Sequence, residues 1–522
     1  MQAVKIKDKE LKWICIKDAI IHQIESGIWR YNCKLPSVRA LSKRFGVSIN
    51  TIQHALSELE STAYIRAIQR SGNVVIWTKN AAANPVPDLS SVVVAVDHSV
   101  VKMLSTAVRG NPPSFVSAVL QDDLVPHSFL KKCITTVVKK DDHNITSFLP
   151  PPGLDRLRIR IAGLMLNRGV ICSPDDVLIT SGDTIALELA LAAVAKIGDT
   201  IAIEYPTYYG ILQIIERLGM KALPIKTDPR LGIDIEYLTH ALEEHSISAI
   251  FLNPTLHNPM GFVMDNEARG TLSAVAKRFN VPIIEDDIFF DLLPQDGKPR
   301  TLKSFTHHES TIYCSSFSKT VAPGYRVGWC VPGRFKNEIL AQMFSRNLSV
   351  SSLPQYVLSE YLARGYLESH CLMLGAKFSR STQFLANLVQ TCFTPNTQYI
   401  PPVGGFIHWI TLPPNTDMDN FLNAVANRGL HIGSSNIFYA DQADSNNIRI
   451  CLGRTLSSEI KAALKVLGDA SLVSQLPSGK RQRPKRLGSD LKQGTTSRAN
   501  DNSVAENMPH NKGHALYRGR PE

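Results

Sequence analysis

Residues 311–330, TIYCSSFSKTVAPGYRVGWC, place Lys319 in a turn of small residues directly after an alternating apolar strand. A lysine amine held in apolar surroundings has a lowered pKa and reacts with an aldehyde to form a Schiff base. Ser316, Ser318 and Arg326 add two hydroxyls and a guanidinium, which suit a dianionic phosphate. Together these residues predict an anchor for pyridoxal 5'-phosphate, although a serine-rich surface loop with two cations would have the same composition.

The segments before this stretch alternate between apolar strands and helices. Residues 175–195 and 199–219 each predict a strand, a short turn and a helix, and residues 247–264 and 281–293 each end an apolar strand in polar residues. Alternation of this length predicts an α/β domain with a mostly parallel sheet. The ligand of such a domain binds at the carboxyl ends of the strands.

Polar and aromatic residues follow those strands and complete a candidate site. Asn258 places an amide in a turn, Asp286 ends a strand, and Tyr208 supplies a ring that could stack on a cofactor. Ser181 and Gly182 precede a helix whose first N–H groups could face a phosphate. Each residue also has an ordinary structural explanation, as a turn asparagine, a capping aspartate or a core tyrosine, so the whole ordered set carries the interpretation.

Residues 1–78 predict a separate head. Apolar residues recur at helical spacing in three segments, and they are Trp13, Ile16, Ile20 and Ile24, then Val38, Leu41 and Phe45, then Ile52, Ala55, Leu56 and Leu59. Gly27 and Gly46 are expected to end the first two helices, and Ser48 to cap the third. A hairpin turning at residues 70–73 follows, which completes a winged helix-turn-helix plan of the α+β class.

In that plan the exposed side of the third helix enters the major groove, where amide side chains pair with base edges. Neighbouring basic residues then contact phosphates. The candidate DNA-binding residues are Arg39, Lys43, Arg44, Ser48, Asn50, Thr51, Gln53, His54, Arg70 and Gly72. A small helical protein-binding module would have the same periodicity and stays the alternative at this point.

The charge of the chain is concentrated at its ends. The 522 residues have a formal net charge of +11, of which residues 1–80 carry +7 and residues 478–522 carry +6. Basic ends on a nearly neutral body favour contact with nucleic acid. Residues 79–112 predict a linker, and residues 476–522 predict a disordered tail that either adds DNA affinity or is dispensable.

Several classes of protein are disfavoured by the composition. No run of eighteen apolar residues predicts a membrane span, and the start shows no signal segment, so we expect a cytoplasmic protein. The nine cysteines are scattered without C-x-x-C pairs, which favours free thiols in a reducing compartment and predicts no metal site.

Residues 35–60, LPSVRALSKRFGVSINTIQHALSELE, resemble the GntR family of winged-helix transcription regulators. Two departures are visible, because Ile49 stands where the family usually has arginine and residues 62–64 replace a usual glycine. The first departure removes one expected phosphate contact. The resemblance therefore implies binding to double-stranded DNA, but it does not carry over an operator sequence.

The ordered segments PPPG, TSG, YPTYYG, NPTLHNPMG, EDD, SSFSK, GYRVGW, PPVGGFIHW and NNIRI resemble the fold type I aminotransferases of class I and II, across residues 113–475. With the head in front, the chain resembles the MocR subfamily of GntR regulators, in the YdcR-like branch. The resemblance implies a large α/β domain that binds pyridoxal phosphate and a small α+β subdomain at about residues 365–475.

The resemblance also implies roles for single residues. Lys319 would form the internal aldimine, Asp286 would hold the pyridine nitrogen protonated, and Tyr208 would stack on the ring. These three are the implied catalytic residues. Arg449 would bind the carboxylate of an amino acid, with Gly404 and Gly405 shaping the floor of the substrate site. The implied cofactor contacts are Lys319, Asp286, Asn258, Tyr208, Ser316, Ser318, Arg326, Gly182, Asp183 and Thr184.

Three positions depart from the aminotransferase pattern. Phe289 stands where these enzymes usually have a tyrosine that contacts the ring oxygen, and Asp183 puts a carboxylate where a phosphate is expected. Phe148 lies about where a tyrosine of the partner subunit often reaches that phosphate. These changes favour a domain kept for sensing over one kept for rapid turnover.

We therefore expect a transcription regulator that senses an amino compound, or pyridoxal phosphate, through an aldimine at Lys319. The resemblance implies a head-to-tail homodimer on paired operator half-sites. The alternative is a functional aminotransferase with an accessory DNA-binding head. A sensor of pyridoxal phosphate alone and a regulator that has lost the cofactor also stay open.

Overall fold

The computed structural model describes the head and the body of the chain. The described residues are 12–25, 29, 34–61, 64–68, 72–75, 87, 89–94, 114–140, 145–305, 308–346, 348–443 and 445–475. The tail expected at 476–522 and most of the linker expected at 79–112 lie outside them, so both stay predictions. Within the described ranges, no helix has the length and apolar character needed to cross a membrane.

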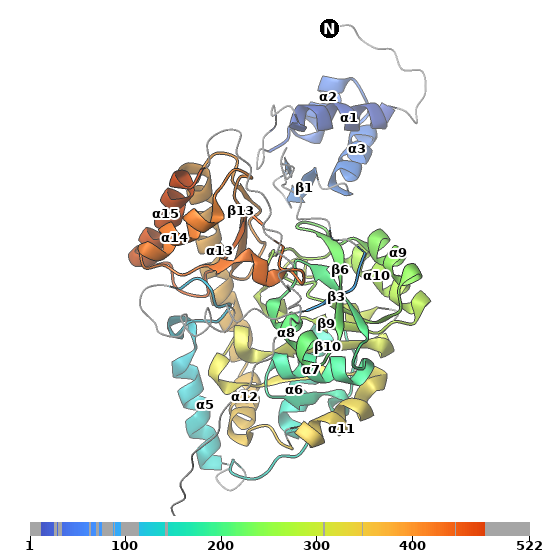
Figure 1. The fold of residues 1–522 in the computed structure, drawn as a ribbon, viewed down its shortest axis with the longest axis vertical. Helices are drawn as coiled ribbons and strands as arrows, with labels where there is room; N and C mark the ends of the chain where they lie inside the picture. The colour runs from blue at the N-terminus through green and yellow to red at the C-terminus, as the bar shows by residue number, and fades with distance from the viewer. Residues whose placement is uncertain are drawn as a thin grey trace, which may run out of the picture. The chain divides into compact units, whose positions relative to one another are not determined.

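Three helices and a hairpin form the head (Figure 1). The elements are α1 (Lys12–Glu25), α2 (Val38–Phe45), α3 (Ile49–Ser61), β1 (Ile65–Ile68) and β2 (Gly72–Val75). The strands are antiparallel, with Ile65 opposite Val75 and Ile68 opposite Gly72. Gly72 and Asn73 are therefore strand residues, and the prediction that they lie in the turn is wrong, because the ladder extends to Gly72.

The apolar periodicity of the head forms its core. Ile20, Leu41 and Ile52 are fully buried in one cluster that the three helices share with the hairpin. Gly46 adopts a left-handed conformation with φ 65°, and its N–H bonds to the carbonyl of Ser42, which ends α2. The predicted end of the first helix at Gly27 lies outside the described residues.

A mixed sheet forms the centre of the large domain. Its strands are β3 (Val92–Val93), β4 (Leu178–Thr180), β5 (Thr200–Tyr205), β6 (Lys221–Asp228), β7 (Gly232–Ile233), β8 (Ile247–Leu252), β9 (Ile283–Asp286), β10 (Thr311–Ser316) and β11 (Gly328–Val331). The order is β3-β6-β5-β8-β9-β10-β11-β4, with β7 paired to β6. The central strands β6, β5, β8, β9 and β10 are parallel, whereas β11 runs antiparallel between β10 and β4.

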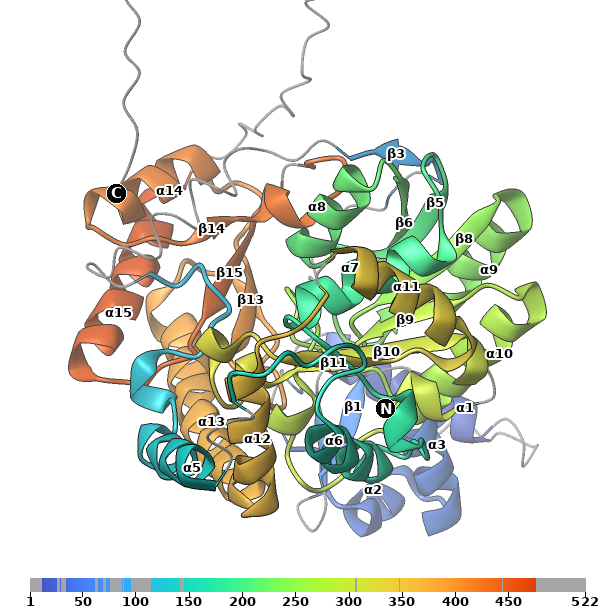
Figure 2. The same cartoon turned by 90° about the horizontal axis from the view of Figure 1, so that it is seen from below.

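Helices cover both faces of this sheet (Figure 2). One face packs against α7 (Asp183–Val194), α8 (Tyr209–Arg217) and α11 (Lys336–Arg346). The other packs against α6 (Asp155–Asn167), α9 (Ile235–Glu244), α10 (Asn266–Phe279) and α12 (Ser352–Ala363), with α5 (His127–Lys140) against α12.

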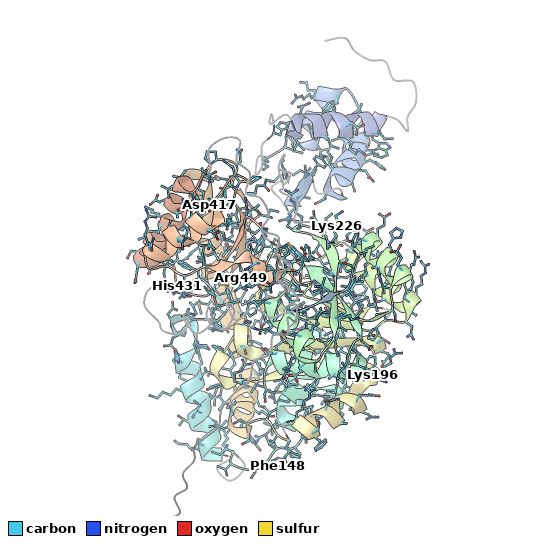
Figure 3. All side chains as sticks on the ribbon, viewed as in Figure 1. Phe148, Lys196, Lys226, Asp417, His431 and Arg449 are labelled. Atoms are coloured by element: carbon cyan, nitrogen blue, oxygen red, sulfur yellow. The ribbon has the colours of Figure 1, made fainter. Side chains whose placement is uncertain are left out.

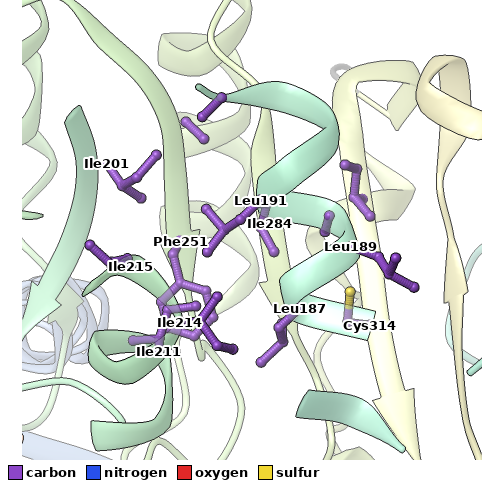
Figure 4. Close-up of a cluster of buried hydrophobic side chains, with 14 of the residues drawn as sticks. Leu187, Leu189, Leu191, Ile201, Ile211, Ile214, Ile215, Phe251, Ile284 and Cys314 are labelled. Atoms are coloured by element: carbon purple, nitrogen blue, oxygen red, sulfur yellow. The ribbon is translucent and has the colours of Figure 1, made fainter. Parts of the chain in front are cut away.

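Alternation along each strand determines which face a side chain joins. Ile312 and Cys314 of β10 lie in the α7 layer, while Tyr313 between them lies in the α6 layer. Figure 4 shows the α7 layer, where Leu191 of the helix lies beside Ile284 of the sheet. The sheet is thus buried on both sides, and only its strand ends are open to a ligand.

The small subdomain follows a long helix, α13 (Tyr366–Cys392). Its other elements are β12 (Gln398–Tyr399), β13 (Ile407–Thr411), α14 (Met418–Asn427), β14 (Gly433–Ser434), β15 (Asn447–Cys451) and α15 (Ser458–Val473). The four strands form an antiparallel sheet in the order β12-β13-β15-β14. This arrangement agrees with the α+β subdomain expected from the sequence.

Candidate functional site

The carboxyl ends of β4, β5, β8, β9 and β10 meet at one edge of the large sheet, because these strands run in the same direction. A pocket with an empty volume of about 410 Å³ opens at this edge. Every predicted cofactor residue except Gly182 lines it, together with Ile288 and Phe289. The parallel topology therefore brings together residues that are up to 143 positions apart, from Asp183 to Arg326.

Lys319 ends a 3-10 turn, Phe317–Lys319, that directly follows β10. Its amine donates a hydrogen bond to the carbonyl of Ala118 at 2.6 Å, and it lies 5.7 Å from the centroid of the Phe289 ring. Burial lowers the pKa of Lys319, although Asp183 and Asp286 oppose that shift. A lowered pKa increases the fraction of neutral amine, which is the form that attacks an aldehyde.

Asp286 is the last residue of β9 and is buried. One of its carboxylate oxygens accepts a hydrogen bond from the N–H of Ile288 at 3.2 Å. Burial raises the pKa of Asp286 well above its usual value, and the neighbouring Asp183 raises it further. A cationic ring nitrogen placed beside this carboxyl group would stabilise its ionised form.

Asn253 links two predicted residues and was not itself predicted from the sequence. Its side-chain amide donates to the carbonyl of Asp286 at 2.7 Å, and its side-chain oxygen accepts from the N–H of Asn258 at 2.7 Å. Asn253 is fully buried directly after β8. A polar amide directly after an apolar strand was the signal that could have identified it.

Arg449 of β15 lies in the small subdomain (Figure 3), and its side chain is fully buried. Its guanidinium donates to the side-chain oxygen of Asn258 at 2.8 Å and to the carbonyl of Val116. The ring of Phe438 lies 4.6 Å from the guanidinium carbon. Asn258 therefore connects the lysine pocket with the arginine predicted to bind a carboxylate.

Gly404 and Gly405 do not line the lysine pocket. A Cβ atom on Gly404 would lie 2.6 Å from the carbonyl oxygen of Leu292, and one on Gly405 would lie 3.2 Å from Leu256. Both glycines therefore allow a close approach of the chain to the wall of the large domain. Their predicted role in shaping the substrate floor stays a prediction.

The end of the pocket near α7 offers donors for an anion. Arg326 donates to the Ser318 hydroxyl at 3.3 Å, and the Ser318 N–H donates to the Ser316 hydroxyl at 3.2 Å. Gly182 has φ 90°, and a Cβ atom there would lie 2.4 Å from a guanidinium nitrogen of Arg326. Glycine is thus required for the guanidinium to lie against the start of α7.

These groups fit pyridoxal phosphate by their chemistry. An amine, a buried carboxyl group and an anion cradle line the same pocket, and the glycine at position 182 lets the Arg326 guanidinium lie close to the start of α7. The ring of Tyr208 also lines the pocket and lies over Gly210, where a Cβ atom would be 2.4 Å from it. Thr184 is exposed at the pocket rim.

The three departures from the aminotransferase pattern have different surroundings. Phe289 is buried against Phe406, with their ring centroids 5.9 Å apart. Asp183 is buried, and one of its oxygens has no hydrogen-bond partner among the described residues. Phe148 lies at the surface of this chain (Figure 3), and it is 63% exposed.

The predicted DNA-binding residues of α3 present an exposed face. Asn50 and Gln53 are exposed, and the Ser48 hydroxyl accepts from the N–H of Thr51 at 3.2 Å, as expected of a cap. His54 is also exposed, but its ring centroid lies 4.4 Å from that of Trp13, so the ring is positioned by α1.

The basic residues predicted to contact phosphates lie on and near α2. Arg39 and Lys43 are exposed, and Arg44 is exposed while donating to the side-chain oxygen of Gln23 at 3.1 Å. Gly72 is exposed at the start of β2. Arg70 lies outside the described residues, so its predicted contact stays a prediction.

Comparisons with known proteins match both parts of the chain. The model of the aminotransferase class I and II family matches residues 118–467, and the model of bacterial regulatory proteins of the gntR family matches residues 15–75. The HTH-type transcriptional regulator YjiR of Escherichia coli is 33% identical over 86% of this chain and 97% of its own. YdcR of the same organism is 31% identical over 88% and 98%.

The fold of the body is shared with a solved aminotransferase. The kynurenine aminotransferase of Pyrococcus horikoshii has a TM-score of 0.68 and 23% identity, covering 73% of this chain and 95% of its own. At this identity the likeness establishes the fold alone.

Proposed function

This chain belongs to the aminotransferase class I and II family and to the MocR subfamily of GntR regulators, and from this premise we propose that it is a transcription regulator controlled by pyridoxal phosphate. The observation that carries the proposal is the pocket in which Lys319, Asp286 and Asn258 converge, with Arg449 bonded to Asn258. The head that precedes it has the exposed polar face of a DNA-binding helix.

Bound pyridoxal phosphate would supply an aldehyde and an electron-withdrawing ring, and we propose that the protein holds it through an aldimine at Lys319. Asp286 would keep the ring nitrogen protonated. Ser318 and Arg326 would bind the phosphate by charge-assisted hydrogen bonds. The buried guanidinium of Arg449 would then recognise the carboxylate of an amino compound.

Segment 114–121 would transmit the effect of ligand binding from the pocket to the rest of the chain. Its carbonyls at Val116 and Ala118 accept hydrogen bonds from Arg449 and Lys319. The same segment joins the small subdomain, because Phe115 bonds to the backbone of His431 and Cys451 at 2.9 Å and 3.0 Å. A ligand on either cation would replace one of these bonds and shift the segment that follows the linker.

The proposal includes a homodimer that binds paired operator half-sites in the cytoplasm. Exposed apolar side chains support a subunit interface, since Phe129 on α5, Ile159 on α6 and Phe148 are 39%, 54% and 63% exposed. Two heads in such a dimer would contact two half-sites, and a ligand would act by changing the distance between them.

The visible absorption spectrum and operator binding of the purified full chain test the proposal together. We expect an absorption band that is absent from Lys319→Ala and that shifts with one amino compound in a panel. The same compound should change the affinity for promoter DNA in the wild type and leave the variant unchanged. A protein that stays colourless with added pyridoxal phosphate would refute the cofactor part.

A functional aminotransferase is the second candidate, because the structure retains Lys319, Asp286 and Arg449 around one site. Repeated conversion of an amino acid and a keto acid, over many turnovers per protein, would favour this candidate. A single stoichiometric spectral change without turnover would favour the regulator.

A further inference from the structure

The carboxyl group of Asp183 lies inside the pocket, at the place where the phosphate is expected. Asp183 is the first residue of α7, is only 6% exposed and lines the pocket with Lys319 and Arg326. One of its carboxylate oxygens has no hydrogen-bond partner among the described residues. An unpartnered buried oxygen that faces a pocket is unusual and points to a function toward the ligand.

The start of α7 has the features that favour an anion. Asp183 and Thr184, the first residues of the helix, line the pocket, no side chain caps the helix at Gly182, and Gly182 allows the Arg326 guanidinium to approach closely. The carboxylate of Asp183 already supplies a negative charge to this cradle. A phosphate dianion would add a second negative charge beside this buried carboxylate, and like charges repel.

The groups around Asp183 determine when its carboxyl group is charged. Burial raises the pKa of Asp183 to about 7, while the positive charges of Lys319 and Arg326 oppose that shift. Two acidic residues face Asp183. Asp286, the last residue of β9, is hydrogen-bonded to it, and Asp287 follows directly after β9. The remaining facing groups are neutral at pH 7, and they are Tyr208, Cys314 and Cys330.

We propose that Asp183 makes phosphate binding proton-dependent, so that the chain takes up one proton when it binds the phosphorylated cofactor. This inference rests on the proposed function, because it assumes that pyridoxal phosphate is the ligand of the pocket. Below pH 7 the neutral carboxyl group donates its O–H to a phosphate oxygen. Above pH 7 the ionised group repels it, and affinity falls about tenfold for each pH unit.

The test uses pyridoxamine 5'-phosphate, which has no aldehyde and so cannot react with Lys319. Its dissociation constant and proton uptake are measured by calorimetry between pH 6 and 9, in buffers of different ionisation enthalpy. Wild type and Asp183→Asn are compared, because asparagine keeps the shape and removes the charge. Pyridoxamine, which has the same ring and no phosphate, serves as the control ligand.

We expect the wild type to lose about tenfold in affinity between pH 7.5 and 8.5 relative to Asp183→Asn, and to take up nearly one more proton. Equal pH slopes and equal proton uptake in the two proteins would overturn the inference. The same difference with pyridoxamine would also overturn it, because the effect would then act on the ring through Asp286. Asp183→Ser provides a second variant if the asparagine protein does not fold.

Failure of the proposed function gives a different result. If neither protein binds pyridoxamine 5'-phosphate at any pH, the cofactor proposal and this inference are both refuted. If both bind it with the same pH dependence, the cofactor proposal stands and the role of Asp183 alone is refuted.

Discussion

Replacing Gly182 with alanine tests whether Arg326 holds a phosphate against the start of α7. Gly182 has φ 90° and ψ 172°, a region that is open almost only to glycine. The new Cβ atom would lie 2.4 Å from a guanidinium nitrogen of Arg326 and 2.9 Å from its central carbon. Both the backbone and the arginine must therefore move.

The two effects have different magnitudes and different readouts. The backbone strain costs on the order of 1–3 kcal/mol of unfolding free energy. The arginine is exposed and its far end is flexible, so moving it costs little stability. A displaced guanidinium loses a hydrogen bond to a charged phosphate, which contributes about 1.5–3 kcal/mol, so the phosphate should bind roughly 10- to 150-fold more weakly.

Gly198→Ala provides the matched control. Gly198 also has a positive φ, 87°, but no atom lies within 4 Å of the position of its Cβ atom. The control should lose stability and keep its affinity for pyridoxamine 5'-phosphate. Urea unfolding and calorimetric titration at pH 6.5, below the pKa of about 7 to which burial raises Asp183, measure the two quantities for both variants.

One result would refute this reasoning directly. If Gly182→Ala binds pyridoxamine 5'-phosphate within twofold of the wild type and of Gly198→Ala, Arg326 does not bind the phosphate from its position against Gly182. The phosphate site would then have to be sought elsewhere in the pocket.

Three further predictions concern other parts of the molecule. Arg449→Met should weaken an amino-acid effector roughly 10- to 150-fold by removal of a charged hydrogen bond, with cofactor binding unchanged, as spectral titration would show. Burial lowers the pKa of His408 to about 3, so this side chain stays neutral in the folded state, whereas it is protonated below pH 6.5 in the unfolded chain. The contribution of His408 to stability should therefore fall by about 1.4 kcal/mol per pH unit as the pH drops from 6.5 toward 3, and His408→Gln should reduce the total slope by this amount in urea unfolding. Arg39→Ala should lower the salt dependence of operator binding by about one counterion, as binding titrations at several salt concentrations would show. Gln53→Ala should instead relax the preference for one base of the operator, as titrations with operator variants would show.

The sequence predicted the elements better than their contacts. Ile20, Leu41 and Ile52 have the 3.6-residue spacing of buried helix positions, and the structure confirms it. The pocket was also expected, because ligands of such sheets bind at the carboxyl ends of the parallel strands. Asp183 and Lys319 follow two such ends and line the pocket. The reversed direction of β11 was not expected, because a strand does not encode its direction in its own residues.

Backbone contacts could not be predicted from the residues at all. Val116 and Ala118 approach Arg449 and Lys319 through carbonyl oxygens, which every residue type possesses. The partners are separated by 333 and 201 positions in the chain. Asn253 differs, because its side-chain amide is specific and its place after an apolar strand was visible in the sequence.

The two carbonyls also bear on how strongly a ligand can act on the DNA-binding head. A hydrogen bond to a charged group contributes about 1.5–3 kcal/mol, so the bonds of Lys319 and Arg449 to segment 114–121 together contribute about 3–6 kcal/mol. Moving a two-state equilibrium from 1:99 to 99:1 requires about 5.5 kcal/mol of differential binding. Replacement of one bond supplies only part of that difference, and replacement of both is needed to approach it. A ligand that occupies Lys319 alone should therefore produce a partial response, and a ligand with a carboxylate on Arg449 should complete it.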